Sequence, residues 1–235
     1  MSTPIGQRLE GAVERLDAPD ADPREVAASL DDLARINSLL GGTRLTVRAL
    51  ERLLSGRERG PLTLLDAGSG GGDMAGALAA WARRRGFEPH VIAVDASPAI
   101  TELAAARVGD DVDLRVGNML ALDLEDGAVD VATCSLVIHH FEPPDAARAL
   151  RELARVARVG VILNDLVRTR LGLLGAHVLI RSLTRNAITQ HDAVLSVRRA
   201  YTRRELLELV HEAGLRTVHV KGWLGYRVAV AAVPA

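Results

Sequence analysis

The sequence predicts an α/β fold in which helices cover both faces of a mostly parallel sheet and only the last strand runs antiparallel. From residue 62 onward, short apolar runs of strand length alternate with segments of helical periodicity. Such alternation implies parallel strands, because each parallel connection must cross the sheet. The last two expected strands, 216–223 and 226–232, are separated by so short a link that they must form an antiparallel hairpin.

Each element follows from a local pattern. Residues 5–16 and 23–55 carry apolar side chains at helical spacing, with Gly41-Gly42 as a break in the second stretch. Thr202, followed three residues later by Glu205, forms a capping box for a late helix. The expected strands are 62–66, 91–95, 112–116, 129–134, 159–164, 216–223 and 226–232, and the expected helices after residue 60 are 73–84, 98–107, 144–157, 171–183 and 202–213.

These elements divide the chain into two parts. Residues 1–60 form an amino-terminal helical cap, and residues 61–235 form one domain with an insertion at about 166–199 that departs from the alternating rhythm. A length of 235 residues exceeds the common domain size of about 100–150 but suits one sheet with added helices. We expect the cap to close over a ligand.

Composition narrows the class of protein. Hydrophobic residues make up 48% and charged residues 25%, as in ordinary globular proteins. A net charge of -1 provides no field to attract polyanions, which argues against a nucleic-acid partner. The single cysteine, Cys134, cannot form an internal disulfide, and no signal peptide or long apolar run is visible. We therefore expect a cytoplasmic enzyme with no membrane span.

A glycine-rich loop between the first strand and its helix marks a binding site. After Asp66 come Gly68, Ser69, Gly70 and Gly72, where the backbone can turn sharply and the following helix offers free N–H groups. Asp95 ends the next strand, where its carboxylate can accept both hydroxyl protons of a ribose. The pair of features implies a cofactor that contains a nucleoside.

The loop with its preceding acid, D-x-G-x-G-x-G from Asp66, resembles the class I S-adenosylmethionine-dependent methyltransferases over residues 62–232. That family has a Rossmann-like, seven-stranded sheet whose last strand is antiparallel, as the terminal hairpin predicts. The glycines and Ala75 also satisfy the G-x-G-x-x-A form of dinucleotide-binding loops, so a nicotinamide-dependent oxidoreductase is an alternative. A methyltransferase acting on protein or RNA, and a nucleoside-binding module without turnover, are the others.

The resemblance implies a role for each matching position. Asp66 would hold the methionine amino group of S-adenosylmethionine, and Asp95 would bind the ribose. The glycine loop would line the methionyl moiety, Asn118 and Met119 would lie beside the adenine, and Arg44 is the candidate partner for the methionine carboxylate. The remaining cofactor candidates are Gly68, Ser69, Gly70, Gly72, Ala96 and Ser135.

Each of these positions also has a structural interpretation. Asp66 and the glycines could form a tight turn that caps a helix, and Asn118 could be a turn residue. Ser135, at the end of the fourth strand, could be an ordinary core or turn residue.

Two adjacent histidines are the candidates for work on the acceptor. His139 and His140 follow the fourth strand, in the loop that faces the cofactor methyl in this family, and His191 in the insertion is the reserve candidate. Histidine exchanges a proton near neutral pH, although a packing or capping role is an equal alternative. No carboxylate or cysteine at ligand spacing accompanies the pair, so we expect no metal.

The insertion suggests what the acceptor is. Its apolar stretch, residues 171–180, could form a wall of a hydrophobic pocket or simply pack on the sheet. Residues 164–168 and 191–202 resemble methyltransferases found with type III polyketide synthases and, more distantly, quinone-pathway methyltransferases. The resemblance implies methylation of a hydroxyl or an activated ring carbon of a phenolic, pyrone or quinone-like compound. A homodimer is left open.

Overall fold

The computed structural model describes residues 5–18 and 21–235 and contains one seven-stranded sheet in the order β3-β2-β1-β4-β5-β7-β6. β1 to β5 are parallel, and β7 runs antiparallel to both β5 and β6. The strands are β1 Pro61–Ala67, β2 Glu88–Asp95, β3 Val112–Val116, β4 Val129–Ser135, β5 Ala157–Leu166, β6 Leu215–Trp223 and β7 Arg227–Pro234. This architecture confirms the predicted fold class.

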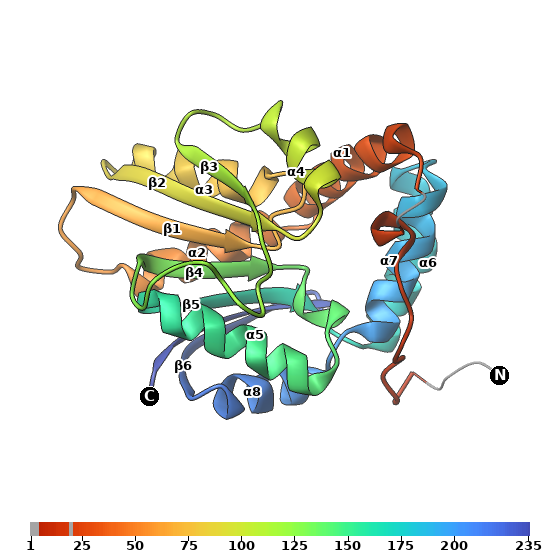
Figure 1. The fold of residues 1–235 in the computed structure, drawn as a ribbon. Helices are drawn as coiled ribbons and strands as arrows, with labels where there is room; N and C mark the ends of the chain where they lie inside the picture. Colours follow the sequence, from red (N-terminus) through yellow and green to blue (C-terminus); the bar gives the residue numbers. More distant parts are fainter. Residues whose placement is uncertain (1–4, 19–20) are drawn as a thin grey trace.

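The helices cover both faces of the sheet and one of its ends (Figure 1). They are α1 Pro23–Leu39, α2 Gly42–Leu53, α3 Asp73–Arg84, α4 Pro98–Ala105, α5 Pro143–Val156, α6 Arg170–Leu183, α7 Ala187–Arg199 and α8 Arg203–Glu212, with short 3₁₀ helices η1 Arg15–Asp17 and η2 Ile138–His140. No helix in these described parts of the chain is both long and apolar enough to cross a membrane.

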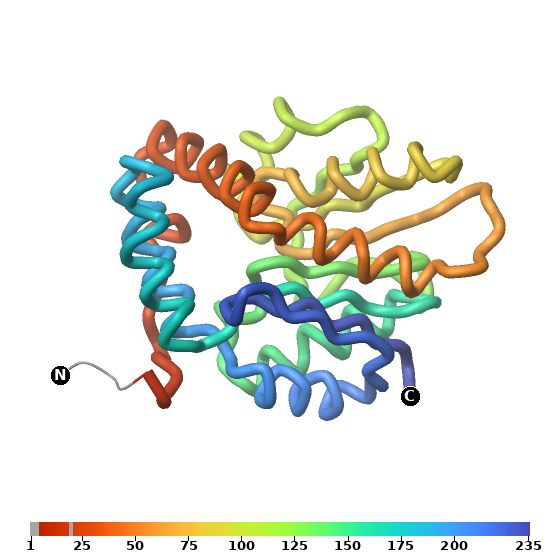
Figure 2. The backbone as a smooth tube through the Cα atoms, turned by 180° about the vertical axis from the view of Figure 1, so that it is seen from behind, coloured from red at the N-terminus to blue at the C-terminus, as the bar shows by residue number. Residues whose placement is uncertain are grey.

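Two hydrophobic cores hold the layers together. α2 and α3 bury apolar side chains against one face of the sheet, and α5 and α8 bury theirs against the other. The view from behind shows α2 lying across the sheet (Figure 2). Because the central strands are covered on both faces, both faces are buried and their residues are mostly apolar rather than strictly alternating. β4, for example, is buried from Val129 through Cys134.

The first predicted helix, residues 5–16, is wrong. Only Arg15–Asp17 is helical, as a single 3₁₀ turn, and Gly11 has a φ of 65°. Tertiary hydrogen bonds hold this segment instead: Leu9 donates its N–H to the carbonyl of Arg198, and Arg8 donates to the carbonyls of His139 and Phe141. A glycine in mid-segment costs helix stability, so these distant acceptors decide the conformation.

The other elements are confirmed to within a few residues, and the structure adds their positions. α2 packs on β5 and β7, so it lies in a helical layer against the sheet. α1, the segment through η1, and the helices α6 and α7 of the insertion gather beyond the end of the sheet toward which β1 and β4 point (Figure 1). The sequence predicts one helix and a mixed segment in the insertion. The insertion forms two helices, α6 and α7, which pack against each other.

Candidate active site

A cavity of about 1420 Å³ opens where the parallel strands end. Ligand sites usually measure about 300–1,000 Å³, so this cavity exceeds what one small molecule needs. Its apolar wall comes from α1 and from the insertion. The apolar side chains on this wall include Val26, Leu30, Leu33, Ile36, Leu171, Ala176, Leu179 and Ile180.

The glycine loop turns at one end of this cavity. Gly68 has a φ of 69°, and a Cβ placed there would lie 2.4 Å from Cγ2 of Val137. Only glycine fits this backbone conformation and this close approach. The N–H groups of Gly68 and Ser69 both donate to the carbonyl of Val94, at 2.7 and 3.0 Å. The loop is therefore fixed between the ends of β1 and β2.

Asp66 is buried beneath the loop, with 1% of its surface exposed. Its Oδ1 accepts a hydrogen bond from the Thr133 hydroxyl at 2.9 Å, whereas its Oδ2 has no partner among the described residues. Burial raises the pKa of Asp66 to about 7, and the carboxylates of Asp73 and Asp95 add to the increase. A buried carboxylate with a free oxygen fits a cationic group such as an ammonium.

The residues expected around the nucleoside all line the cavity: Asp95, Ala96, Asn118 and Met119. Asp95 also organises the loop, because its Oδ2 accepts from the Gly70 N–H at 2.8 Å and its Oδ1 from the Ser97 N–H at 3.0 Å. Asn118 is also a turn residue, which is the structural role considered for it as an alternative.

The turn of Asn118 uses one side-chain atom. Its Oδ1 accepts from the Leu120 N–H at 2.9 Å. Ser135 lines the cavity too, with its hydroxyl 3.4 Å from that of Thr46. The structure thus brings both residues to the cavity, where each side chain already makes a hydrogen bond within the protein.

Four other candidates do not line the cavity. Ser69 and Gly72 belong to the glycine loop but lie outside the lining, and Arg44 is exposed on the first turn of α2. His191 also lies outside it, with Nδ1 2.8 Å from Oδ1 of Asp192 and 42% of its side chain exposed. Arg44 is therefore placed away from any ligand in the cavity, because the helix that carries it packs on the sheet.

Arg227 is a buried cation on the cavity that sequence reasoning missed. It is 3% exposed, and its Nε donates to Oδ1 of Asn164 at 2.8 Å. Its Nη2 has no partner among the described residues. Burial lowers the pKa of Arg227 to about 10, which keeps it charged at neutral pH. Its position at the start of a terminal strand gave no local signal of a site.

His139 is held firmly by Asp165. The Nδ1 atom lies 2.7 Å from Oδ1 of Asp165, and the backbone N–H of His139 donates to the other carboxylate oxygen at 3.0 Å. Burial alone would lower the pKa of His139, but Asp165 and Glu14 outweigh it and raise this pKa to about 10. His139 therefore keeps a proton at neutral pH in this arrangement.

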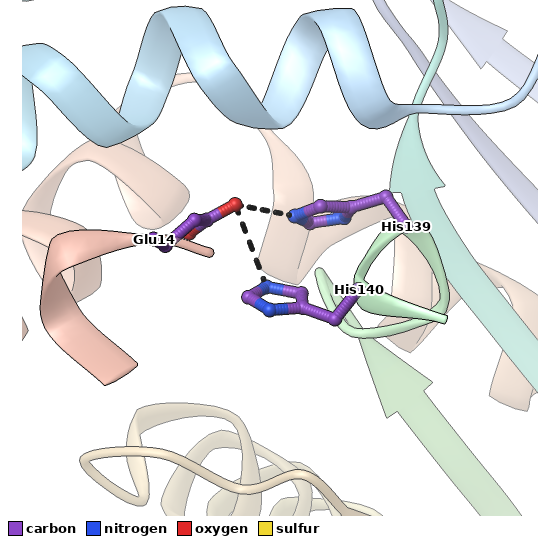
Figure 3. A group of neighbouring side chains, drawn as sticks. All are labelled: Glu14, His139 and His140. Atoms are coloured by element: carbon purple, nitrogen blue, oxygen red, sulfur yellow. Dashed lines mark ion pairs between the residues drawn. The ribbon is translucent and has the colours of Figure 1, made fainter. Parts of the chain in front are cut away.

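Glu14 brings a carboxylate from the amino-terminal segment to both histidines (Figure 3). Its Oε1 lies 3.4 Å from Nε2 of His139 and 3.7 Å from Nε2 of His140, and it accepts from the Ser196 hydroxyl at 2.7 Å. Although burial would raise the pKa of Glu14, its hydrogen-bonded and charged neighbours lower it to about 2. More than 120 residues separate Glu14 from the histidines in the sequence, so no spacing pattern could reveal the cluster.

Part of this chain matches a known family model. Residues 65–163 match a family model described as a methyltransferase domain. A 37.1 kDa protein of a transposon from Streptomyces fradiae is 32% identical over 155 residues, which are 65% of this chain and 40% of that protein. The match thus covers about two fifths of the length of that relative.

Solved structures share the fold at low identity. A SAM-dependent methyltransferase from Aquifex aeolicus is 20% identical, with a TM-score of 0.58 over 90% of this chain and 97% of the other. The magnesium protoporphyrin IX methyltransferase of Synechocystis, solved with bound SAH, is 19% identical, with a TM-score of 0.59 over 88% and 95% of the two chains. The [4+2]-cyclase SpnF is 17% identical, with a TM-score of 0.59 over 82% and 81%.

The glycine loop, the free carboxylate oxygen of Asp66 and the acid at the end of β2 lie within or beside the matched segment. The buried Asp66 suits the ammonium of a methionyl group, and Asp95 suits ribose hydroxyls. Residues 65–163 are therefore a methyltransferase domain within a class I methyltransferase fold, with S-adenosylmethionine as the cofactor.

Proposed function

We propose that this chain transfers a methyl group from S-adenosylmethionine to a small molecule, at a hydroxyl or an activated ring carbon of a phenolic, pyrone or quinone-like compound. The observation that carries the proposal is the continuity of one cavity. The same cavity is lined by Asp66 and Asp95 at one end, by His139 and His140, and by the apolar wall. The methyl donor and the acceptor molecule can thus bind in one cavity, beside the polar side chains of the histidines.

We assign the cofactor contacts as follows. Asp66 pairs with the methionine ammonium, and Arg227, rather than the exposed Arg44, pairs with the methionine carboxylate. Asp95 binds the ribose hydroxyls, while Asn118 and Met119 lie beside the adenine. The support for Arg227 is its unpartnered Nη2 and its place on the cavity. The planar guanidinium of arginine can donate two parallel hydrogen bonds to a carboxylate. Water competes less for these hydrogen bonds when the guanidinium is buried.

Transfer needs little from the protein beyond position. The cofactor supplies a methyl group bonded to a sulfonium sulfur, and the rest of the cofactor is a neutral thioether after transfer. Holding the acceptor in line with that methyl can supply much of the rate acceleration, and the apolar wall excludes water. The histidines would orient or activate an acceptor hydroxyl at the polar part of the cavity.

Loss of the Asp95 carboxylate should weaken cofactor binding. The variant Asp95→Ala leaves ribose hydroxyls unpaired and also frees the N–H groups of Gly70 and Ser97. We expect a loss of about 1–3 kcal/mol in the affinity for S-adenosylmethionine, measured by titration calorimetry. A replacement of Arg44 by Ala is the matched control, because Arg44 does not line the cavity. Equal affinity in the Asp95 variant and the wild type would remove the ribose assignment.

The acceptor class is tested by incubation with labelled S-adenosylmethionine and a panel of phenols, pyrones and quinones, alongside peptides and RNA. Label in a small molecule supports the proposal, and label only in peptide or RNA contradicts it. The fold alone does not guarantee methyl transfer, since a [4+2]-cyclase shares it. Cofactor binding with no transfer to any acceptor would favour a module without turnover. Thermal protection by nicotinamide nucleotides instead of S-adenosylmethionine would favour an oxidoreductase.

A further inference from the structure

Three ligand-type side chains converge on one point of the cavity wall. Glu14, His139 and His140 each offer one ligand atom, and these atoms all lie within 4.8 Å of one another. The Nε2 atoms of the two histidines lie 3.4 and 3.7 Å from the same oxygen of Glu14. Two ligands about 2.1 Å from a tetrahedral ion lie about 3.4 Å apart, which follows from the bond length and the tetrahedral angle. The cluster thus has the separations of a coordination shell.

The outer contacts of both histidines match those of metal ligands. Nδ1 of His139 faces Oδ1 of Asp165 at 2.7 Å, and Nδ1 of His140 faces Oδ2 of Asp17 at 3.1 Å. Metal-bound histidines usually donate their other ring N–H to a carboxylate, which fixes the ring and its tautomer. Both rings are therefore oriented with Nε2 toward Glu14, as Figure 3 shows.

One atom of the cluster lacks a hydrogen-bond partner. His139 is 2% exposed, and its Nε2 makes no hydrogen bond within the described residues. The acceptor that faces this atom, Oε1 of Glu14, lies 3.4 Å away, which is longer than a typical hydrogen bond and matches the separation of two ligands of one ion. Three carboxylates, those of Glu14, Asp17 and Asp165, surround the two imidazoles, and a divalent cation would offset this negative charge.

We propose that Glu14, His139 and His140 bind a divalent transition-metal ion, with zinc as the best match to two imidazoles and one carboxylate. Binding would displace the proton on Nε2 of His139, because only a neutral imidazole nitrogen coordinates a metal. All three residues line the cavity, so a fourth coordination position can face it. No metal is expected from the sequence, because the carboxylate of this proposed site, Glu14, comes from a segment far from the histidines.

The role of the ion rests on the proposed function. An acceptor hydroxyl bound at the fourth position would have its pKa lowered, and its proton would pass to water. The resulting oxygen forms the new bond to the methyl carbon while the sulfur–carbon bond breaks and its electron pair stays on the thioether. Metal binding itself does not depend on this step.

The test is metal binding by the full-length, tag-free protein after chelator treatment. We expect one Zn²⁺ per chain by equilibrium dialysis, one Co²⁺ with visible absorption bands of an N/O-coordinated ion, and no comparable binding of Mg²⁺, which prefers oxygen ligands. Glu14→Gln and His140→Ala should each weaken Zn²⁺ binding by about 100-fold or more and change the Co²⁺ spectrum. Asp17→Asn should weaken it by about 10- to 100-fold through the ring of His140.

His211→Ala is the control, because His211 is an exposed imidazole on α8. Circular dichroism and S-adenosylmethionine binding establish that each variant is folded. The absence of stoichiometric Zn²⁺ binding in the wild type, or equal affinity in Glu14→Gln and His140→Ala, overturns the site. If a chelator leaves methyl transfer unchanged, only the role of the ion is overturned. If the metal binds but no methyl transfer occurs, only the proposed function is overturned.

Discussion

The affinity for S-adenosylmethionine should rise nearly tenfold for each pH unit well below pH 7, and less steeply as pH 7 is approached. In the free protein the pKa of Asp66 is about 7, so its carboxyl group is mostly protonated below this pH. The methionine ammonium requires the ionised form, so binding at low pH must release a proton. The dependence flattens above pH 7, and it reverses as the α-amino group itself titrates at about 7.7–8.0.

Calorimetry in buffers of different ionisation enthalpy measures both the affinity and the proton release. Asp66→Asn should remove the pH dependence below pH 7 and weaken binding at pH 7.5 by about 10- to 100-fold, as expected for a hydrogen bond to a charged group. Asp95→Asn is the matched control, since it should weaken binding but keep the slope. Proton release and slope that persist in Asp66→Asn would show that another group is the partner of the ammonium.

Replacement of the cavity histidines should lower turnover by about 10²- to 10⁴-fold while the cofactor affinity stays intact. His140→Ala removes a ring that is partly exposed to the cavity, and His139→Gln keeps a side-chain donor near Asp165 so that this buried carboxylate is not left alone. The measurement is the single-turnover rate with the best acceptor of the panel.

His191→Ala should keep the wild-type rate, because His191 lies outside the cavity beside Asp192. This variant tests the reserve role that the sequence suggested for His191. Wild-type rates in both His139→Gln and His140→Ala would mean that position alone drives the transfer. A loss of S-adenosylmethionine binding in either variant would instead show that the replaced histidine contributes to the cofactor site.

Local patterns were enough to predict the sheet and to place Asp66 and Asp95 at the same edge of it. Buried strands are continuous apolar runs, helices repeat every three to four residues, and the two-residue link before Tyr226 allows only a hairpin. Asp66 and Asp95 were found because a parallel sheet brings the ends of neighbouring strands together, so chain order already specifies their proximity. The capping box of Thr202 and Glu205 is equally local and is present.

The acceptor end was decided by tertiary structure. Glu14 reaches the histidines because Arg8, Leu9 and Ser196 hold its segment across the insertion, and these hydrogen bonds join residues far apart in the sequence. Arg227 is on the cavity because the last strand inserts beside β5, while Arg44 is outside because α2 joins the sheet layer. Sequence alone therefore determined the fold and the two carboxylates, Asp66 and Asp95, that line one end of the cavity. The packing of the amino-terminal segment and the insertion, which no short-range pattern encodes, decided which charged groups share the cavity.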